Sequence, residues 1–313
     1  MSVEITVVEN YKRFGRCLKL SNGQIEALVT VDVGPRIISF GFCGGINIMR
    51  EDLEDETNQK GEAFDNYYYP GAQWHIYGGH RLWTSPESLP ETYYPDNTPV
   101  AYTLKENGVI LNPDPQKENG IQMQMELTMS PDKPEMKVEH RVTNISDNEK
   151  EFALWSLTVL TQGGLEIIPQ NTVDTGLLAN RVLAVWPYAD TQDERFFCGN
   201  KYISIRQDNT KTEAFKIGLN NMNGYAMYAV GDTVFVNRYE PKHPDGNYPD
   251  YGVSFETYTN NFICELETLG TLNKVPSGAT ESHTEYWSLA KNPGTPDGRN
   301  EAELEQFVKN ILG

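Results

Sequence analysis

The chain is built largely from short strand-like segments separated by turn signals. β-branched and aromatic residues dominate these segments, and Asn-Gly steps mark sharp reversals between several of them. Before residue 300, apolar residues almost never recur at the spacing of a helix. Regular strand spacing of this kind predicts an all-β fold, a large antiparallel β-sandwich. The expected strands span residues 24–33, 35–42, 101–104, 108–111, 121–129, 135–144, 151–160, 202–206, 214–219, 225–230, 233–238, 253–258, 262–269 and 281–289.

One helical pattern stands out, at the C-terminal end of the chain. Apolar residues at positions 304, 307, 308, 311 and 312 follow helical spacing over 301–312, and Asn300 is a suitable N-cap. The 313 residues contain no linker-like break and no internal repeat. We therefore expect a single domain over residues 1–313 that ends in a short helix.

The charge balance limits the partners of the chain. Lys and Arg total 26 against 44 Asp and Glu, which gives a net charge of −18. Such a surface repels nucleic acid and anionic membranes, so neither is an expected partner. The N-terminal residues lack a signal-peptide pattern, no apolar run approaches roughly 18 residues, and the four cysteines are scattered. We expect a cytoplasmic protein with reduced thiols.

Two glutamates interrupt the otherwise apolar strand expected at 262–269. Successive side chains of a strand point to opposite faces, so Glu265 and Glu267 should project on the same face as Ile263 and Leu269. Two like charges in apolar surroundings raise the pKa of one carboxyl group, which suits proton transfer. The alternative is an exposed edge strand whose polar face meets solvent.

Two long segments without evident secondary structure are expected to roof a pocket. The first, 51–97, contains the sequence Gln-Trp-His-Ile-Tyr-Gly-Gly-His-Arg-Leu-Trp at 73–83, and the second is 239–251. Aromatic faces stack on the C–H faces of sugar rings, while His and Arg bind hydroxyl groups. The pattern favours a carbohydrate cleft, and the alternative is a packed loop whose histidines bond to backbone carbonyls.

The remaining histidines lead to two further expectations. A metal site from His75, His80, Glu87 and His243 is disfavoured, because spacings of five and seven residues do not form a tight chelating motif. We therefore expect no metal and no cofactor. His140 is expected on the surface and His283 is expected to be structural, although 281–287 also carries Glu and Trp.

Four parts of the chain resemble the galactose mutarotase-like (aldose 1-epimerase) superfamily. Residues 21–40 are similar to the opening strands of that family, and residues 77–83 to its Gly-Gly stretch. Residues 264–268 are similar to its catalytic-glutamate strand, and residues 274–278 to the turn before its last strand. These segments span most of the chain in the same order. The resemblance implies a β super-sandwich and looks closest to a branch distinct from the mutarotases proper.

The resemblance also implies a catalytic scheme in which a strand glutamate takes the anomeric proton and a histidine protonates the ring oxygen. By position Glu267 matches the base, with Glu265 as the alternative. The family has His before its two glycines, where this chain has Tyr77, and its Asn-His strand corresponds to a segment that offers Trp155. The usual acid is therefore missing from both places.

Two functions remain open on this resemblance. Either His75, His80 or His243 replaces the acid, and the protein is an aldose 1-epimerase-like isomerase, or it binds carbohydrate without epimerising it. The ligand is a small or oligomeric carbohydrate in both cases, and long strands that pair edge to edge leave a homodimer open. The residues expected to contact the sugar are Arg36, Trp74, Tyr77, Arg81, Trp83, Trp155, Lys216, Tyr248 and Asp250.

Overall fold

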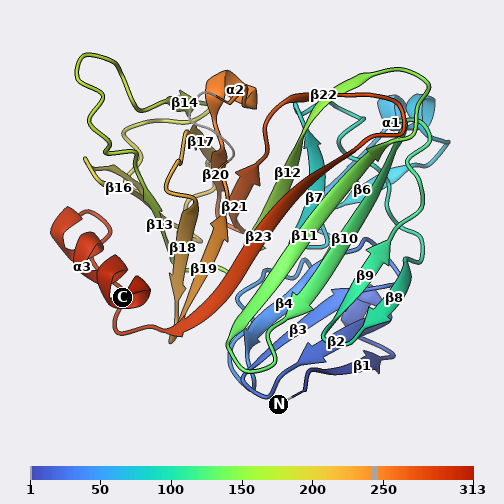
Figure 1. Cartoon of the computed structure of the whole chain (residues 1–313), viewed down its shortest axis with the longest axis horizontal. Helices are drawn as coiled ribbons and strands as arrows, with labels where there is room; N and C mark the ends of the chain where they lie inside the picture. Colours follow the sequence, from blue (N-terminus) through green and yellow to red (C-terminus); the bar gives the residue numbers. More distant parts are fainter. Residues whose placement is uncertain (1, 242–245) are drawn as a thin grey trace.

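Two large antiparallel sheets pack face to face and form a β super-sandwich (Figure 1). The computed structural model describes residues 2–241 and 246–313. The first sheet has eleven strands and the second has ten. The all-β antiparallel sandwich predicted from the sequence is confirmed.

The first sheet carries the strand with the paired glutamates at its centre. Its order is β1-β2-β3-β4-β7-β12-β21-β20-β17-β14, and β22 pairs with β12 beside this path. All of its pairings are antiparallel, as expected for a chain of hairpins. The strands are β1 (Glu4–Val8), β2 (Cys17–Ser21), β3 (Ile25–Thr30), β4 (Ile37–Phe42), β7 (Gly79–Ser85), β12 (Lys150–Leu160), β14 (Leu183–Val185), β17 (Phe215–Leu219), β20 (Phe255–Thr259), β21 (Cys264–Leu269) and β22 (Asn273–Val275).

The second sheet closes the other side of the core. Its order is β15-β16-β13-β18-β19-β23-β11-β10-β9-β8, with the long strand β23 near the middle. The strands are β8 (Ala101–Lys105), β9 (Gly108–Asn112), β10 (Ile121–Met129), β11 (Glu135–Asn144), β13 (Leu165–Pro169), β15 (Phe196–Cys198), β16 (Tyr202–Arg206), β18 (Tyr225–Val230), β19 (Thr233–Tyr239) and β23 (Thr280–Lys291).

Helices are few and short in the described part of the chain. α3 (Glu301–Leu312) covers part of the outer face of the second sheet with Leu304, Phe307 and Val308. Its N-cap is Asn300, whose side chain accepts hydrogen bonds from two backbone N–H groups, so this helix is confirmed as predicted. The other elements are η1 (Lys12–Phe14), α1 (Glu62–Tyr67), α2 (Pro249–Gly252) and the two-stranded sheet of β5 (Asn58–Lys60) and β6 (Gln73–His75). None of the helices described here has the length and apolar character needed to cross a membrane.

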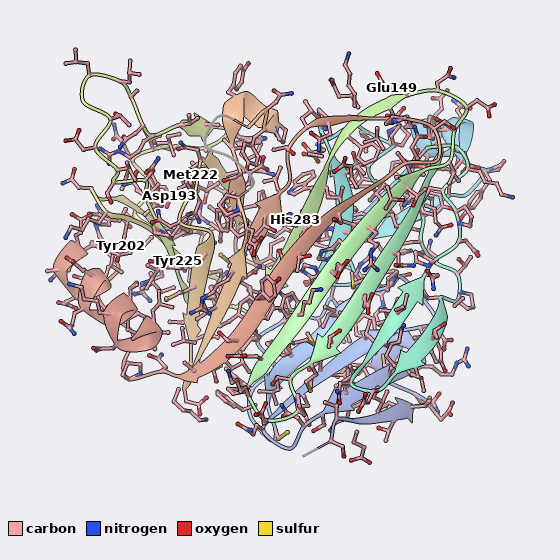
Figure 2. The ribbon with its side chains drawn as sticks, in the orientation of Figure 1. Glu149, Asp193, Tyr202, Met222, Tyr225 and His283 are labelled. Atoms are coloured by element: carbon pink, nitrogen blue, oxygen red, sulfur yellow. The ribbon has the colours of Figure 1, made fainter. Side chains whose placement is uncertain are left out.

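The main core lies between the two sheets and is rich in aromatic residues. The Phe40 ring of the first sheet lies 6.1 Å from the Phe235 ring and 5.4 Å from the Trp287 ring of the second. All three side chains are almost completely buried, and burying each contributes about 1.5–3 kcal/mol. Figure 2 shows side chains of both sheets in this space, with His283 on β23. His283 is buried, in agreement with its predicted structural role.

The expectation that 51–97 lacks secondary structure was wrong. This segment contains β5, α1, β6 and β7, and β7 is an inner strand of the first sheet between β4 and β12. Both faces of β7 are buried, so its sequence Gly-His-Arg-Leu-Trp-Thr-Ser shows no alternation of apolar and polar residues. Without that alternation the usual signal for a strand is absent.

Candidate functional site

Glu265 and Glu267 project from β21 on the outer face of the first sheet. β21 pairs with β12 on one side and β20 on the other, so it is not an edge strand. The same face carries Ile263 and Leu269, which belong to an apolar cluster separate from the main core. The predicted orientation of both glutamates is confirmed, and the edge-strand alternative was wrong.

Glu265 is paired with Arg81, which β7 places two strands away. Arg81 Nη1 lies 3.1 Å from Glu265 Oε1, and both side chains are largely buried. The guanidinium group stands over the Trp83 ring, 4.2 Å from its centre, and 5.6 Å from that of Trp74. Arg81, Trp74 and Trp83 are therefore gathered beside the glutamates, as predicted, but they pack against one another.

Glu267 is completely enclosed and accepts hydrogen bonds from two side chains. Trp155 Nε1 donates to Glu267 Oε2 at 2.9 Å, and Lys216 Nζ donates to the same oxygen at 3.2 Å. Lys216 Nζ also lies 2.7 Å from Glu256 Oε2, so one ammonium group bridges two carboxyl groups. Glu267 has no exposed surface, so the predicted base does not reach solvent.

The register of five strands explains why these charges meet. Leu157 of β12 lies opposite both Arg81 and Glu267, and Glu267 lies opposite Glu256 of β20. In the neighbouring row Glu265 lies opposite Tyr258, which faces Lys216 of β17. Because paired residues share a face of the sheet, both rows point outward together. The resulting buried charge cluster consists of Arg81, Lys216, Glu256, Glu265 and Glu267.

Burial and mutual repulsion favour the protonated form of two of these carboxyl groups. Burial raises the pKa of Glu267 to about 7, although Lys216 acts in the opposite direction. Burial also raises the pKa of Glu256 well above its ordinary value, again against the effect of Lys216. Burial alone would lower the pKa of Lys216, but Glu267 and Glu256 outweigh it and raise that pKa, so Lys216 stays charged. Both carboxyl groups therefore keep their protons to higher pH than an ordinary glutamate, beside a fixed cation.

An open cleft of about 490 Å³ lies over this cluster. This volume falls in the range of small-molecule sites, roughly 300–1,000 Å³. Of the charge cluster, Glu256 alone lines the cleft among the described residues, and its Oε1 is buried there with no hydrogen-bond partner. We call this site the Glu256 cleft. Its carboxyl and aromatic lining residues are Glu87, Asp250, Glu256, Tyr93, Trp155 and Trp186.

Glu256 and Trp186 line the cleft and are candidate site residues that the sequence reasoning missed. Glu256 stands in the segment Phe-Glu-Thr-Tyr-Thr of β20, in a strand that was predicted but not examined for charge. A charged residue inside a buried strand that precedes the Glu-Leu-Glu strand was the available signal. Trp186 follows β14, a three-residue strand that the sequence did not reveal.

His80 was wrongly expected at the rim of a cleft. Its side chain has no exposed surface and points into the core between the sheets, on the opposite face from Arg81. His80 Nδ1 lies 2.9 Å from Thr158 Oγ1, and His80 Nε2 lies 2.8 Å from His140 Nε2. His140, expected on the surface, is likewise fully buried. Neither imidazole is placed to protonate a sugar in the Glu256 cleft.

His75 and Tyr77 lie apart from the charge cluster. His75 Nδ1 lies 2.6 Å from Asp55 Oδ1, and its ring centre is 5.3 Å from that of Tyr77. The Tyr77 hydroxyl donates to Asn97 Oδ1 at 2.7 Å, and its ring belongs to a small core with Phe14. Neither residue is brought to the Glu256 cleft.

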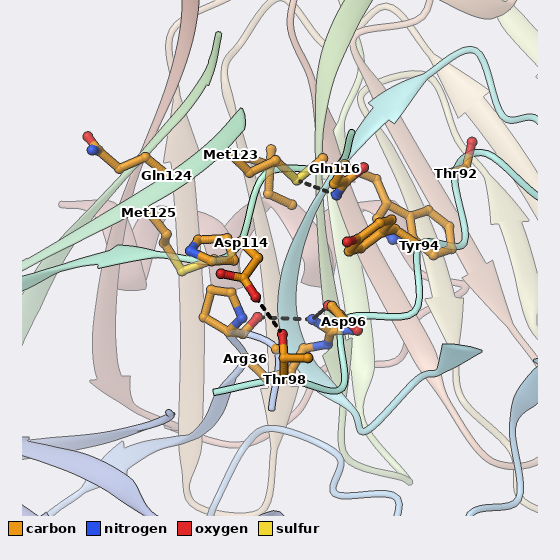
Figure 3. Close-up of a pocket in the computed structure, with 15 residues that line it drawn as sticks. Arg36, Thr92, Tyr94, Asp96, Thr98, Asp114, Gln116, Met123, Gln124 and Met125 are labelled. Atoms are coloured by element: carbon orange, nitrogen blue, oxygen red, sulfur yellow. Dashed lines mark hydrogen bonds and ion pairs between the residues drawn. The ribbon is translucent and has the colours of Figure 1, made fainter. Parts of the chain in front are cut away.

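Arg36 also has a structural position. It forms two hydrogen bonds to Asp96, at 2.6 and 3.1 Å, and donates to the backbone oxygen of Ile76 (Figure 3). The cavity in Figure 3, which Arg36 helps to line, offers about 30 Å³, room for little more than water. Arg36 is therefore not a sugar ligand in this arrangement.

The second predicted rim is only partly described. His243 lies outside the described residues. Tyr248 is buried before α2, whereas Asp250 of α2 lines the Glu256 cleft as expected. Within the described ranges, no group of three His, Cys, Asp or Glu side chains is placed to hold a metal ion. The suggested ligands His75, His80 and Glu87 lie in three different environments.

Comparison with known proteins supports the fold at low sequence identity. No protein-family model and no curated protein sequence matches the chain. Three solved structures share its fold. A TPR-domain-containing protein from Parabacteroides distasonis is 12% identical with a TM-score of 0.60, and the match covers 88% of this chain and 47% of that longer one. A candidate aldose 1-epimerase from Klebsiella pneumoniae is 12% identical with a TM-score of 0.56, over 99% and 86%. A galactose mutarotase-like protein from Lactobacillus casei is 10% identical with a TM-score of 0.53, over 88% and 100%.

The topology and these comparisons together show that the chain has a galactose mutarotase-like fold. At 10–12% identity the likeness concerns the fold and carries no substrate or reaction. The chain spans about half the length of the Parabacteroides protein that it matches. Function must therefore be argued from the Glu256 cleft itself.

Proposed function

We propose that the Glu256 cleft binds the ring of an aldose and catalyses the interconversion of its anomers. The observation that carries this proposal is the position of Glu256, a buried carboxyl group with one free oxygen at the floor of an aromatic-lined cleft. The rings of Trp155 and Trp186 offer apolar faces to the C–H side of a sugar. Three carboxyl groups around them can accept hydrogen bonds from hydroxyl groups.

The chemistry that we propose assigns proton transfer to Glu256 in place of Glu267. The Glu256 carboxylate accepts the proton of the anomeric hydroxyl, the bond between C1 and the ring oxygen breaks, and an aldehyde forms. The ring oxygen takes a proton from the rim of the cleft, from Glu87 or from water. Rotation about C1–C2 and the reverse steps close the ring on its other face and return both protons.

Lys216 and Glu267 support the role of Glu256 in proton transfer. Lys216 keeps a positive charge 2.7 Å from Glu256, which favours the carboxylate, while burial and Glu267 favour the protonated acid. The raised pKa makes Glu256 a stronger base than an ordinary glutamate once it is ionised, and the ion pair with Lys216 favours that ionised form. Glu267 is thus a positioning residue in this proposal, and it does not touch the sugar.

Glu256→Gln tests the proposal in a mutarotation assay followed by polarimetry or NMR with freshly dissolved aldoses. We expect the rate above the spontaneous one to fall about 100-fold or more, because general base catalysis contributes on that order. Glu106→Gln is the matched control, since Glu106 is an exposed glutamate in the turn between β8 and β9. Full activity of Glu256→Gln contradicts Glu256 as the proton carrier.

A second candidate function is sugar binding without turnover. The observation that favours it is that none of the described histidines reaches the cleft, so no imidazole of the described residues takes the place of the usual acid there. In this case the wild-type protein binds an aldose in a titration by calorimetry but leaves the mutarotation rate at its spontaneous value. The two assays performed on one sugar separate the candidates.

A further inference from the structure

We propose that the sugar bound in the Glu256 cleft carries an amino group, whose ammonium form lies against the free oxygen of Glu256. This inference rests on the proposed sugar-binding function and names its substrate class. Four features of the described residues support it: the charge of the lining, the composition of the charge cluster, the aromatic walls and the exclusion of anions.

The lining of the cleft is acidic throughout its described part. Glu87, Asp250 and Glu256 contribute three carboxyl groups, and none of the described residues that line the cleft is Lys, Arg or His. A concave site with one sign of charge concentrates ligands of the opposite sign. The lining therefore favours a cationic ligand over a neutral one of the same shape.

The charge cluster beneath the cleft contains more carboxyl groups than basic groups among the described residues. Glu256, Glu265 and Glu267 supply three carboxyl groups, whereas Arg81 and Lys216 supply two permanent positive charges. Both Glu256 and Glu267 retain one oxygen without a hydrogen-bond partner among the described residues. An ammonium group would supply up to three donors to such an oxygen and would favour the ionised form of its carboxyl group. Of these two glutamates Glu256 is the one that lines the cleft, so the proposal assigns its Oε1 to the ligand.

The aromatic residues of the cleft already accommodate an ammonium group of the protein. Lys216 Nζ lies 4.7 Å from the ring centre of Trp155 and 4.8 Å from that of Trp186. Ammonium groups are attracted to the faces of aromatic rings within about 6 Å. Trp155, Trp186 and Tyr93 therefore form walls that suit a second cation as well as the C–H face of a sugar ring.

The same features exclude acidic sugars. A phosphate or carboxylate group in this cleft would face three carboxyl groups at close range, and Lys216 is already bound by Glu256 and Glu267. The net charge of −18 adds long-range repulsion. Sugar phosphates and uronic acids are therefore not substrates in this proposal.

Matched pairs of sugars that differ in one group test the inference by isothermal titration calorimetry. The pairs are glucosamine with glucose, galactosamine with galactose and mannosamine with mannose, at a pH at which the amines are protonated. We expect at least one amino sugar to bind about tenfold or more tightly than its neutral partner, which corresponds to about 1.4 kcal/mol. N-acetylglucosamine and glucuronate, which lack the ammonium group, should show no such gain.

Two variants test whether the residues that line the cleft cause the preference for an amino sugar over its neutral partner. Asp250→Asn should weaken binding of the preferred amino sugar several-fold more than binding of its neutral partner, because it removes one of the carboxylates facing the ammonium group. Glu106→Gln, far from the cleft lining, should leave the preference unchanged.

The outcomes distinguish this inference from the proposed function. Equal affinity within every pair, together with accelerated mutarotation of neutral sugars, overturns the amino-sugar inference and leaves the isomerase proposal standing. A clear preference for an amino sugar without any acceleration supports the inference and contradicts the isomerase activity. Absence of binding to all six sugars overturns the inference.

Discussion

His80 of the first sheet and His140 of the second face each other across the core, with their Nε2 atoms 2.8 Å apart. Both side chains are completely buried, and burial lowers the pKa of His80 well below its ordinary value and that of His140 to about 4. Glu285 Oε2 lies 3.8 Å from His80 Nε2 and accepts a hydrogen bond from Trp287 Nε1, while Glu285 Oε1 accepts one from the Thr268 hydroxyl. The interior of the sandwich therefore holds a neutral pair of imidazoles that joins its two sheets.

The first prediction is that the fold loses stability in mild acid. In the unfolded chain His140 takes up a proton near pH 6.5, whereas in the folded chain it does so only near pH 4. The unfolded state binds more protons between these values, so the free energy of unfolding is fully retained above about pH 6.5 and falls as the pH drops towards 4. A pKa difference of this size corresponds to on the order of 3 kcal/mol.

Urea unfolding at a series of pH values checks this prediction. His140→Gln should unfold more easily at pH 7 but lose less stability than wild type between pH 7 and pH 5. The dependence should not vanish, because His80 has a lowered pKa as well. Identical pH slopes for the two proteins would rule out a contribution from His140.

The second prediction concerns Glu166, a buried glutamate on β13 whose Oε2 accepts a hydrogen bond from Thr257 at 2.6 Å. Burial raises the pKa of Glu166 to about 8 from an ordinary value of 4.5. The folded state thus holds a proton that the unfolded state releases, so stability is full below about pH 4.5 and falls as the pH rises towards 8. Glu166→Gln keeps the shape and removes this loss, on the order of 5 kcal/mol, at alkaline pH.

Thermal unfolding at pH 6 and pH 9 measures this effect. The difference in Tm between Glu166→Gln and wild type should be more favourable to the variant at pH 9 than at pH 6. A difference that is the same at both pH values would show that Glu166 does not titrate as its burial indicates.

The fold was predictable where one face of an element is buried and the other is not. β10 and β11 alternate buried and partly exposed residues along their whole length, and their predicted bounds 121–129 and 135–144 agree with the structure. α3 has a clear apolar stripe and an N-cap signal at Asn300. β7 lacks such a pattern because both of its faces are buried, so its central place in the first sheet could not be read from its residues.

The sequence predicts only those features of the candidate site that depend on the alternation of side chains between the two faces of one strand. Parity along β21 places Glu265 and Glu267 on one face, and it also separates His80 from Arg81 on β7. Whether Glu267 or Glu256 meets the cleft depends on the register of β20 against β21 and on the position of Lys216. Those relationships arise between strands, and one sequence by itself does not contain them.

The third prediction is that Lys216 is a major source of stability in the charge cluster. Lys216→Met leaves Glu256 and Glu267 buried together without their shared cation, and we expect the free energy of unfolding to fall by about 3–5 kcal/mol. Adding Glu256→Gln to this variant removes one of the unpaired carboxyl groups and should restore part of the loss.

A double-mutant cycle by urea unfolding measures the coupling between Lys216 and Glu256. Lys201→Met is the matched control, because Lys201 pairs with Glu305 on the surface at 2.7 Å and its side chain is 51% exposed. Its effect should be much smaller than that of Lys216→Met. Additive losses for Lys216→Met and Glu256→Gln would contradict the shared ion pair.

The fourth prediction separates sugar binding from folding by means of Trp186. Trp186 lines the Glu256 cleft and is only partly buried, whereas Trp155 is enclosed and donates a hydrogen bond to Glu267. Trp186→Ala removes one aromatic wall, and we expect the affinity for a bound sugar to fall about tenfold with a small change in Tm. Trp186→Phe retains an aromatic face and should recover most of the affinity. Calorimetric titration of both variants decides the matter, since equal binding by wild type and Trp186→Ala would place the sugar away from this wall.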